Sequence, residues 1–332
     1  MDFESMLLTF KQVFNFLVLI FIGYVVRRRN IVGEGASKTL AKLLTWVFTP
    51  LYSVVSLSKN VSIDRVVGYI TNIGWGLLFT FIFIVMANLL AKIFAKDSNE
   101  NGMFTYMFSF CNLGYFGYPF IQAVFGEQML VEYMIFCLPS SITLSVYGYY
   151  ILTRSASTLN EQNATKKEKR KEIVKRIISP PIIGTMIGIT LGLLPINKGS
   201  QAFTDIIKVI APAGNCMSPC AMILTGIVLA KSPLKDLFSS VRAYLISIVR
   251  LVVIPLVAGI ICILLKLVGV SKIVLLLAMC LSCFPAGMNV VVYPESVGLD
   301  SSAGAKPCFI SYILAIITVP IVLSLVQKFI YV

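Results

Sequence analysis

The apolar stretches of this chain decide what it can fold into. About ten runs of roughly 18 to 28 mostly apolar residues follow one another, each long enough to cross the hydrocarbon core of a bilayer as a helix. They occupy 7–26, 39–58, 67–91, 103–125, 131–153, 177–196, 203–230, 240–265, 273–298 and 302–329. With 58% hydrophobic and 13% charged residues, the chain is too apolar for a soluble domain. The sequence predicts an all-α integral membrane protein with about ten transmembrane helices.

Short polar loops between the runs carry most of the positive charge. Roughly two thirds of the 28 Lys and Arg residues fall on the side of the membrane that holds 154–176, including Arg27, Arg28 and Arg29. Cytoplasmic loops carry such an excess. We therefore expect a multi-pass protein of the plasma membrane with both termini outside. Because the net charge of +13 is spread over these loops, it does not indicate a nucleic-acid partner.

A long polar segment at 157–176 divides the chain into two halves, 1–156 and 177–332. Each half has a short first run, a second with a proline at mid-membrane, a long third, an interrupted fourth and an unbroken fifth. Because five crossings are an odd number, the second half lies upside down relative to the first. The matching order predicts two inverted five-helix repeats joined by a cytoplasmic loop.

The fourth and ninth runs are interrupted near their centres, by NLGYFGYP at 112–119 and FPAGMN at 284–289. Pro119 and Pro285 donate no helical hydrogen bond, and the glycines beside them weaken the helix. Irregular backbone at membrane depth survives only where it is buried in protein or lines a polar cavity. We expect a new half-helix after each break, with its proline near the first turn and its positive end at mid-membrane. Such ends favour an anionic group.

An asparagine accompanies each break. The amides of Asn112 and Asn289 offer donors and an acceptor to a carboxylate or to freed backbone. Either asparagine alone fits both interpretations equally, but their corresponding positions in the two halves favour binding. The predicted substrate-binding residues of the breaks are Asn112, Gly117, Pro119, Pro285, Gly287 and Asn289.

Arg250 lies near the middle of the eighth run, and no acidic residue shares its depth. A charge inside the membrane needs a partner or water. Two interpretations stay open. Arg250 contacts the substrate anion and belongs to the binding site, or it bonds carbonyls at helix C-termini as a structural anchor.

Enzymatic functions are disfavoured by the residues that are missing. The chain has no histidine, which excludes His-activated nucleophiles. It has no GxxxxGK[ST] loop, and no pair of carboxylates lies at membrane depth. Cys280 and Cys283 form a CxxC, but no second pair or histidine completes a metal site. We expect a protein that is not an enzyme and holds no metal or cofactor.

Two segments, SFCNLGYFGYPFIQAVFGE at 109–127 and FPAGMNVVVYPESVG at 284–298, and the ten-run layout resemble the auxin efflux carrier family. This family of secondary transporters includes plant PIN-type carriers and bacterial organic acid permeases. The resemblance implies a scaffold of helices 1, 2, 6 and 7, and a mobile transport domain of helices 3–5 and 8–10. It also implies that the broken helices cross at mid-membrane around the substrate carboxylate. Pro50 and Leu51 would form the scaffold side of the pocket, and the resemblance hints at a homodimer.

The chain departs from this family in two places. Plant carriers generally have a proline just before the asparagine of the fourth helix, where this chain has Cys111. We therefore expect a looser or shifted crossing. The third run also lacks the acidic residue that is thought to assist proton handling in some members. The sequence leaves the coupling ion, H⁺ or Na⁺, open.

The first functional hypothesis is a secondary active or facilitative transporter of small organic anions, mono- or dicarboxylates, that works by an elevator-type alternating-access mechanism. An alternative is a sodium-coupled organic anion symporter of the bile-acid type, because crossing helices also build cation sites. A membrane receptor without transport would explain a binding site, but it gives no reason for a duplicated break.

Overall fold

The computed structural model describes residues 3–160, 174, 177–194, 199–231, 233, 235, 238–296, 299 and 301–331. Within these ranges every regular element is helical, and one isolated antiparallel bridge pairs Cys111 with Ala286. The all-α prediction is confirmed for this part of the chain. Most of the predicted connecting loop, 157–176, lies outside the described residues.

The helices follow the predicted apolar runs. Those of the first half are α1 (Phe3–Arg28), α2 (Ala36–Leu43), α3 (Thr49–Asn60), α4 (Val66–Phe94), α5 (Ser98–Ser109), α6 (Tyr118–Phe136), α7 (Leu138–Thr143) and α8 (Tyr149–Asn160). Those of the second half are α10 (Pro180–Leu193), α11 (Gln201–Asn215), α12 (Met217–Leu229), α14 (Val241–Ile248), α15 (Ile254–Leu267), α16 (Lys272–Cys283), α17 (Asn289–Ser296) and α18 (Ser302–Tyr331). π-Helical turns precede α3, α6, α8 and α15, at Leu44–Phe48, Leu113–Gly117, Leu144–Gly148 and Val249–Val253.

Helical segments long and apolar enough to cross a membrane are abundant in the described residues. Six qualify, at Phe10–Arg28, Ala36–Asn60, Ile63–Phe94, Gln201–Leu229, Val241–Leu267 and Ala303–Val326. A further pair, Leu113–Phe136 and Leu138–Arg154, is bent by 49°. Large apolar side chains such as Phe21 and Phe81 are exposed on these helices, where a bilayer would cover them. The chain is a multi-pass membrane protein, and the number of ten crossings stays a prediction.

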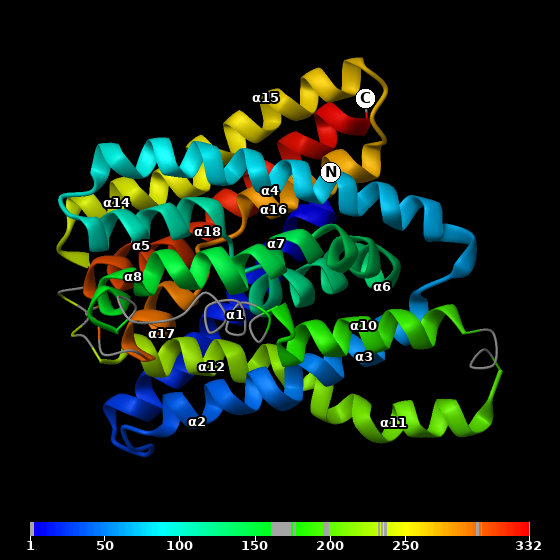
Figure 1. Ribbon diagram of the computed structural model, residues 1–332, viewed down its shortest axis with the longest axis horizontal. Helices are drawn as coiled ribbons and strands as arrows, with labels where there is room; N and C mark the ends of the chain where they lie inside the picture. The colour runs from blue at the N-terminus through cyan, green and yellow to red at the C-terminus, as the bar shows by residue number, and fades with distance from the viewer. Residues whose placement is uncertain are drawn as a thin grey trace.

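The helices are arranged in layers. Figure 1 shows α2, α3, α10, α11 and α12 along one side of the molecule and α4 and α15 along the other. Helices α5 to α8, α17 and α18 lie between these two groups (Figure 1). Helix α1 packs on α12 and also contacts α18. Both broken segments therefore lie in the interior, away from the outer layers.

Glycines allow close packing in the lower layer of Figure 1. Gly184, Gly188 and Gly192 recur every four residues on α10 and face α3, where a Cβ at Gly188 would lie 2.7 Å from the carbonyl oxygen of Ser53. A Cβ at Gly226 of α12 would lie 1.9 Å from a carbonyl oxygen of α1. Small residues at this spacing let membrane helices approach closely. The pairs α10–α3 and α12–α1 each join one helix of the second half to one of the first.

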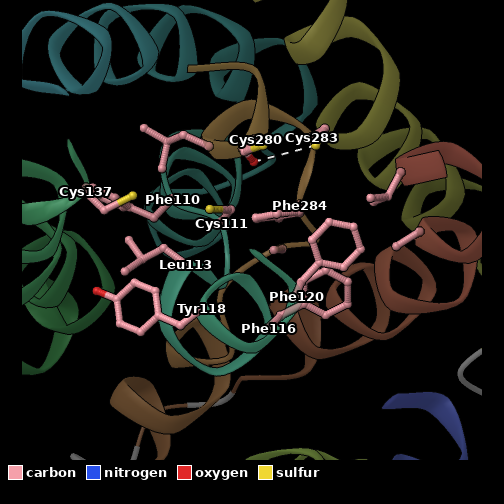
Figure 2. Packing of buried hydrophobic residues seen from close by; sticks show 14 of the residues in the cluster. Phe110, Cys111, Leu113, Phe116, Tyr118, Phe120, Cys137, Cys280, Cys283 and Phe284 are labelled. Carbon is pink, nitrogen blue, oxygen red and sulfur yellow. Dashed lines mark hydrogen bonds between the residues drawn. The ribbon is translucent and has the colours of Figure 1, made fainter. Parts of the chain in front are cut away.

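Aromatic rings fill the space beside the two breaks. The ring of Phe284 lies 5.4 Å from that of Phe116 and 5.1 Å from that of Phe120, both edge-on. Figure 2 shows these rings together, with Cys111 on the neighbouring segment. All three phenylalanines are fully buried. These rings pack against one side of the breaks, so a site can form only on their other side.

Candidate functional site

Two backbone hydrogen bonds flank the bridge between the breaks. The N–H of Asn112 donates to the carbonyl of Pro285 at 2.8 Å, and the N–H of Gly287 donates to the carbonyl of Phe110 at 3.2 Å. The broken helices therefore cross as a short antiparallel pair. Although Cys111 stands where plant carriers generally have a proline, the crossing is paired on both sides of this residue.

Arg250 binds the first half-helix of each broken segment. Its side chain is fully buried and donates to the carbonyls of Phe284 at 3.1 Å, Leu281 at 3.3 Å and Phe108 at 3.4 Å. Two of these carbonyls close α16 and the third closes α5, so the cation lies at two negative helix ends. Among the described residues, no acidic side chain forms a salt bridge with Arg250. These contacts are those of the structural anchor.

The second half-helices begin at the crossing. The first starts with the π-helical turn Leu113–Gly117 and continues into α6. Asn112 caps it, because its Oδ1 accepts from the N–H of Tyr115 at 3.1 Å while its Nδ2 donates to the hydroxyl of Tyr312. The second half-helix, α17, starts at Asn289. Of the two roles that the sequence allowed for Asn112, its side chain has that of bonding freed backbone at the helix start.

A cavity of about 250 Å³ lies against both of these helix starts. From the breaks it is lined by Asn112, Leu113, Gly114, Gly287, Met288 and Asn289. From the layer of α2, α3, α10 and α12 it is lined by Ala41, Thr45, Thr49, Pro181, Ile182, Ala221, Leu224 and Thr225. No Lys, Arg, Asp or Glu is among its lining residues. The cavity is therefore uncharged apart from the two helix ends.

The predicted site residues divide into three groups. Those that line the cavity are Asn112, Gly287 and Asn289. Those that lie in or behind the crossing without lining the cavity are Gly117, Pro119, Pro285 and Arg250. Those on the opposite layer that do not line it are Pro50 and Leu51.

The opposite wall of the cavity comes from residues just before Pro50. A Cβ at Gly184 of α10 would lie 2.5 Å from the Cα of Pro50, so this proline packs against α10. Thr45 and Thr49 line the cavity instead. They lie four residues apart and so share a helix face, a pattern that the sequence contains but that the resemblance did not single out.

The two prolines of the breaks differ in position. Pro119 is the second residue of α6, but the half-helix already begins at Leu113, so Pro119 lies in its second turn and not in its first, contrary to the prediction. Pro285 is not in the first turn of α17, contrary to the prediction. It lies in the extended segment four residues earlier, where its carbonyl accepts from Asn112. The crossing uses the extended residues for pairing, so the second half-helix starts later.

Sequence reasoning missed two hydroxyl side chains. Tyr106 of α5 and Thr49 are both among the residues around the cavity, and neither buried hydroxyl makes a hydrogen bond within 3.5 Å. Asn289 lies beside Tyr106, and Tyr115 lies beside Thr49. A tyrosine or threonine within an apolar run is usually a packing residue, so the sequence alone did not single them out. Only the structure points to these two residues, because buried polar groups without a hydrogen bond are rare in protein interiors.

An acidic side chain also reaches the third predicted helix. Glu132 of α6 is the one buried acidic residue in the part of the chain that the structure describes. Its Oε2 accepts from Nδ2 of Asn72 on α4 at 2.6 Å, and its Oε1 lies 3.4 Å from Arg65. Glu132 does not line the cavity. The third helix therefore has an acid beside it, although its own run has none.

Comparison with known proteins assigns the chain to a family. Residues 8–323 match the family described as Membrane transport protein. The chain belongs to this family. The resemblance to the auxin efflux carriers is thereby confirmed.

Two relatives of this membrane transport protein come from archaea. An uncharacterized transporter of Methanocaldococcus jannaschii is 25% identical over 306 residues, which cover 91% of this chain and 94% of the relative. An uncharacterized transporter of Methanothermobacter thermautotrophicus is 23% identical over 319 residues, which cover 94% and 96%. A membrane transport protein needs a site for its solute, and the cavity at the crossing is the best candidate.

Proposed function

We propose that this transporter carries small organic anions, mono- or dicarboxylates, across the plasma membrane, and that the carboxylate binds at the crossing. The proposal rests on one observation: the C-terminal ends of the half-helices lie at Arg250, whereas the N-terminal ends lie at the cavity. Arg250 bonds the C-terminal ends of α5 and α16, whereas the N-terminal ends near Leu113 and Asn289 border the cavity. Helix N-termini attract anions through their free N–H groups and positive dipole ends.

The same contacts weigh against a sodium site at the crossing. The carbonyls of Phe110 and Pro285 already accept backbone hydrogen bonds, and those of Phe108 and Phe284 accept from Arg250. A sodium ion there would compete for these carbonyls beside a buried positive charge. Uptake measured while external sodium is varied at fixed voltage separates sodium coupling from proton coupling and from uniport.

An elevator-type movement fits the layers of the fold. The scaffold would consist of α1 to α3 and α10 to α12, and the remaining helices would form the transport domain that carries the crossing. The cavity has lining residues from both groups, as a site between a fixed and a moving part requires. The close pairs α10–α3 and α12–α1 support an inverted repeat, because exchange of the two halves turns one pair into the other. Exposed apolar residues of α11, Ile206 and Val209, would suit a homodimer through the scaffold.

Exchange by purified protein in liposomes tests the proposal. We expect labelled carboxylates to exchange, and we expect Asn289→Ala to reduce the rate at least tenfold because it removes an amide from the cavity wall. Asn112→Ala should lower the apparent melting temperature as well, because loss of an N-cap costs about 1 kcal/mol. Asn88→Ala is the matched control. Asn88 of α4 bonds Ile84 of the same helix and Tyr147 of the π-helical turn before α8, and it does not line the cavity.

The outcomes of this experiment are distinct. Wild-type exchange in Asn289→Ala would contradict the site. Absence of carboxylate exchange by folded wild-type protein would contradict the function. Equal losses in Asn88→Ala and Asn289→Ala would show a general defect of the fold.

A further inference from the structure

The lining of the cavity bears on the charge of the substrate. Its polar side chains are hydroxyls and amides, with no cation among them. Each helix N-terminus is equivalent to about half a positive charge, so the two ends together balance about one negative charge. Arg250 lies behind the crossing, at the C-terminal ends of α5 and α16, and does not line the cavity. A second carboxylate in the cavity would therefore contact no cationic side chain, and burying an unpaired charge is costly. The cavity therefore suits an anion with a single negative charge.

Tyr106 adds a requirement for a neutral polar group. This residue is fully buried and is one of the residues around the cavity. Its hydroxyl makes no hydrogen bond within 3.5 Å, and the side chain of Asn289 lies beside it. Gly287 provides the space for it, because a Cβ there would lie 2.9 Å from the hydroxyl oxygen. Leaving such a group unpaired costs about 1–3 kcal/mol. A ligand that pairs it recovers that free energy.

Thr49 lies on the opposite layer of the same cavity. Its Oγ1 is buried and makes no hydrogen bond within 3.5 Å, with Tyr115 beside it, whereas Thr45, one turn earlier, bonds the carbonyl of Ala41. The cavity thus has an unpaired hydroxyl on each side, one from α5 and one from the start of α3. Hydroxyls both donate and accept, so each can pair with a hydroxyl or a carbonyl of a ligand.

We propose that the substrate is a small monocarboxylate with a neutral hydroxyl or carbonyl near its carboxylate, and that Tyr106 binds this second group. The inference rests on the proposed function and narrows its substrate class. The carboxylate occupies the two helix ends, and the hydroxyls of Tyr106 and Thr49 hold the rest of the molecule. A volume of about 250 Å³ is small for a ligand site, which fits a molecule of a few carbon atoms.

Tyr133 offers a matched control for Tyr106. It is also fully buried with an unpartnered hydroxyl, and a Cβ at Gly117 would lie 2.9 Å from that oxygen. The hydroxyl of Tyr133 therefore lies beside Gly117 of the first break, just as the hydroxyl of Tyr106 lies beside Gly287 of the second break. Tyr133 does not line the cavity. If the hydroxyl of Tyr106 served only packing, Tyr106→Phe and Tyr133→Phe would have the same effect on anion exchange.

The test compares four labelled anions in proteoliposomes at neutral pH: lactate, pyruvate, propionate and malonate. We expect lactate or pyruvate to exchange at least tenfold more efficiently than propionate, which lacks the second group, and than malonate, which carries two charges. Tyr106→Phe should reduce exchange of the preferred anion about tenfold and leave propionate within about twofold. Tyr133→Phe should leave all four rates within about twofold.

Several results would overturn the inference. One is faster exchange of malonate than of lactate and pyruvate. This result would contradict the inference about a single charge but would still agree with the proposed transport of organic anions. Another is an unchanged preference in Tyr106→Phe. If that variant does not fold, as judged by its melting transition, the wild-type ranking of the four anions decides alone. Failure of folded wild-type protein to exchange any of a wider set of carboxylates would instead refute the proposed function.

Discussion

At the scale of single residues, the crossing depends on backbone groups more than on side-chain types. The bonds that flank the bridge come from Asn112 and Gly287, so the N–H of Cys111 takes no part in the pairing. Phe110 before it is extended, with φ −121° and ψ 120°, the conformation that a residue before proline adopts. The hydrogen bonds of the bridge and the conformation of Phe110 are therefore both compatible with a proline at position 111.

Cys111→Pro should accordingly preserve the fold. We expect its free energy of unfolding to lie within about 1 kcal/mol of that of Cys111→Ala, the control for loss of the sulfur, because neither removes a bridge hydrogen bond. Asn112→Pro should cost more, since it deletes the donor to Pro285. Thermal melting of the purified proteins in detergent measures this. A Cys111→Pro protein as unstable as Asn112→Pro would contradict the pairing described.

Arg250 is the second residue whose role can be tested singly. Arg250→Met removes the donor to three buried carbonyls and should destabilise the protein by about 3 kcal/mol or more. Arg250→Lys keeps the charge with shorter reach and should lose less. If Arg250 is an anchor, folded Arg250→Lys protein should bind the carboxylate within about threefold of the wild-type affinity. A tenfold weaker affinity at an unchanged melting temperature would instead indicate contact with the substrate.

At the scale of elements, a charged contact joins the start of α5 to α14. Arg242 donates to Oε1 of Glu100 at 2.8 Å and to the carbonyl of Phe94, and its guanidinium lies 5.1 Å from the ring centre of Phe104. Glu100 precedes the apolar range 103–125. The hydrogen bond from Arg242 holds the pKa of this carboxyl below its usual range.

This contact gives stability a defined pH dependence. Because the folded pKa of Glu100 lies below the unfolded value of about 4.3, its contribution is fully present above that value and is lost as pH falls through the folded pKa. Glu100→Gln should lower the free energy of unfolding by about 1 kcal/mol at pH 7, and the difference from the wild type should shrink below about pH 4.3. Melting temperatures across pH measure it.

Glu34→Gln is the control for this prediction. The Glu34 side chain is 95% exposed and lies 3.6 Å from Arg27, and exposed ion pairs contribute little. Its melting temperature should follow that of the wild type at every pH. A gap between Glu100→Gln and the wild type that stays constant down to acidic pH would contradict the role given to the carboxylate.

At the scale of the whole molecule, the sequence predicted what depends on neighbours along the chain. Apolar runs predicted the helices, and proline with glycine predicted both breaks. Each of these signals is local.

What the sequence could not provide depends on distant partners and on helix rotation. The partners of Arg250 lie 31, 34 and 142 residues away, and the space around Tyr106 depends on Gly287. Thr45 and Thr49 line the cavity in place of Pro50 and Leu51. Thr45 lies within the π-helical turn before α3, and Thr49 comes directly after it. Such a turn adds a residue and changes which face of the helix points inward.

The bridge between the breaks also has a consequence for how the protein is made. Asn112 finds its backbone partner only when Pro285, 173 residues later in the chain, has been synthesised. At about 5–20 residues per second, the N–H of Asn112 and the carbonyl of Phe110 wait roughly ten to thirty seconds for the groups with which they pair across the bridge. During biogenesis, the insertion machinery or water must cover this segment until the ribosome delivers its partner.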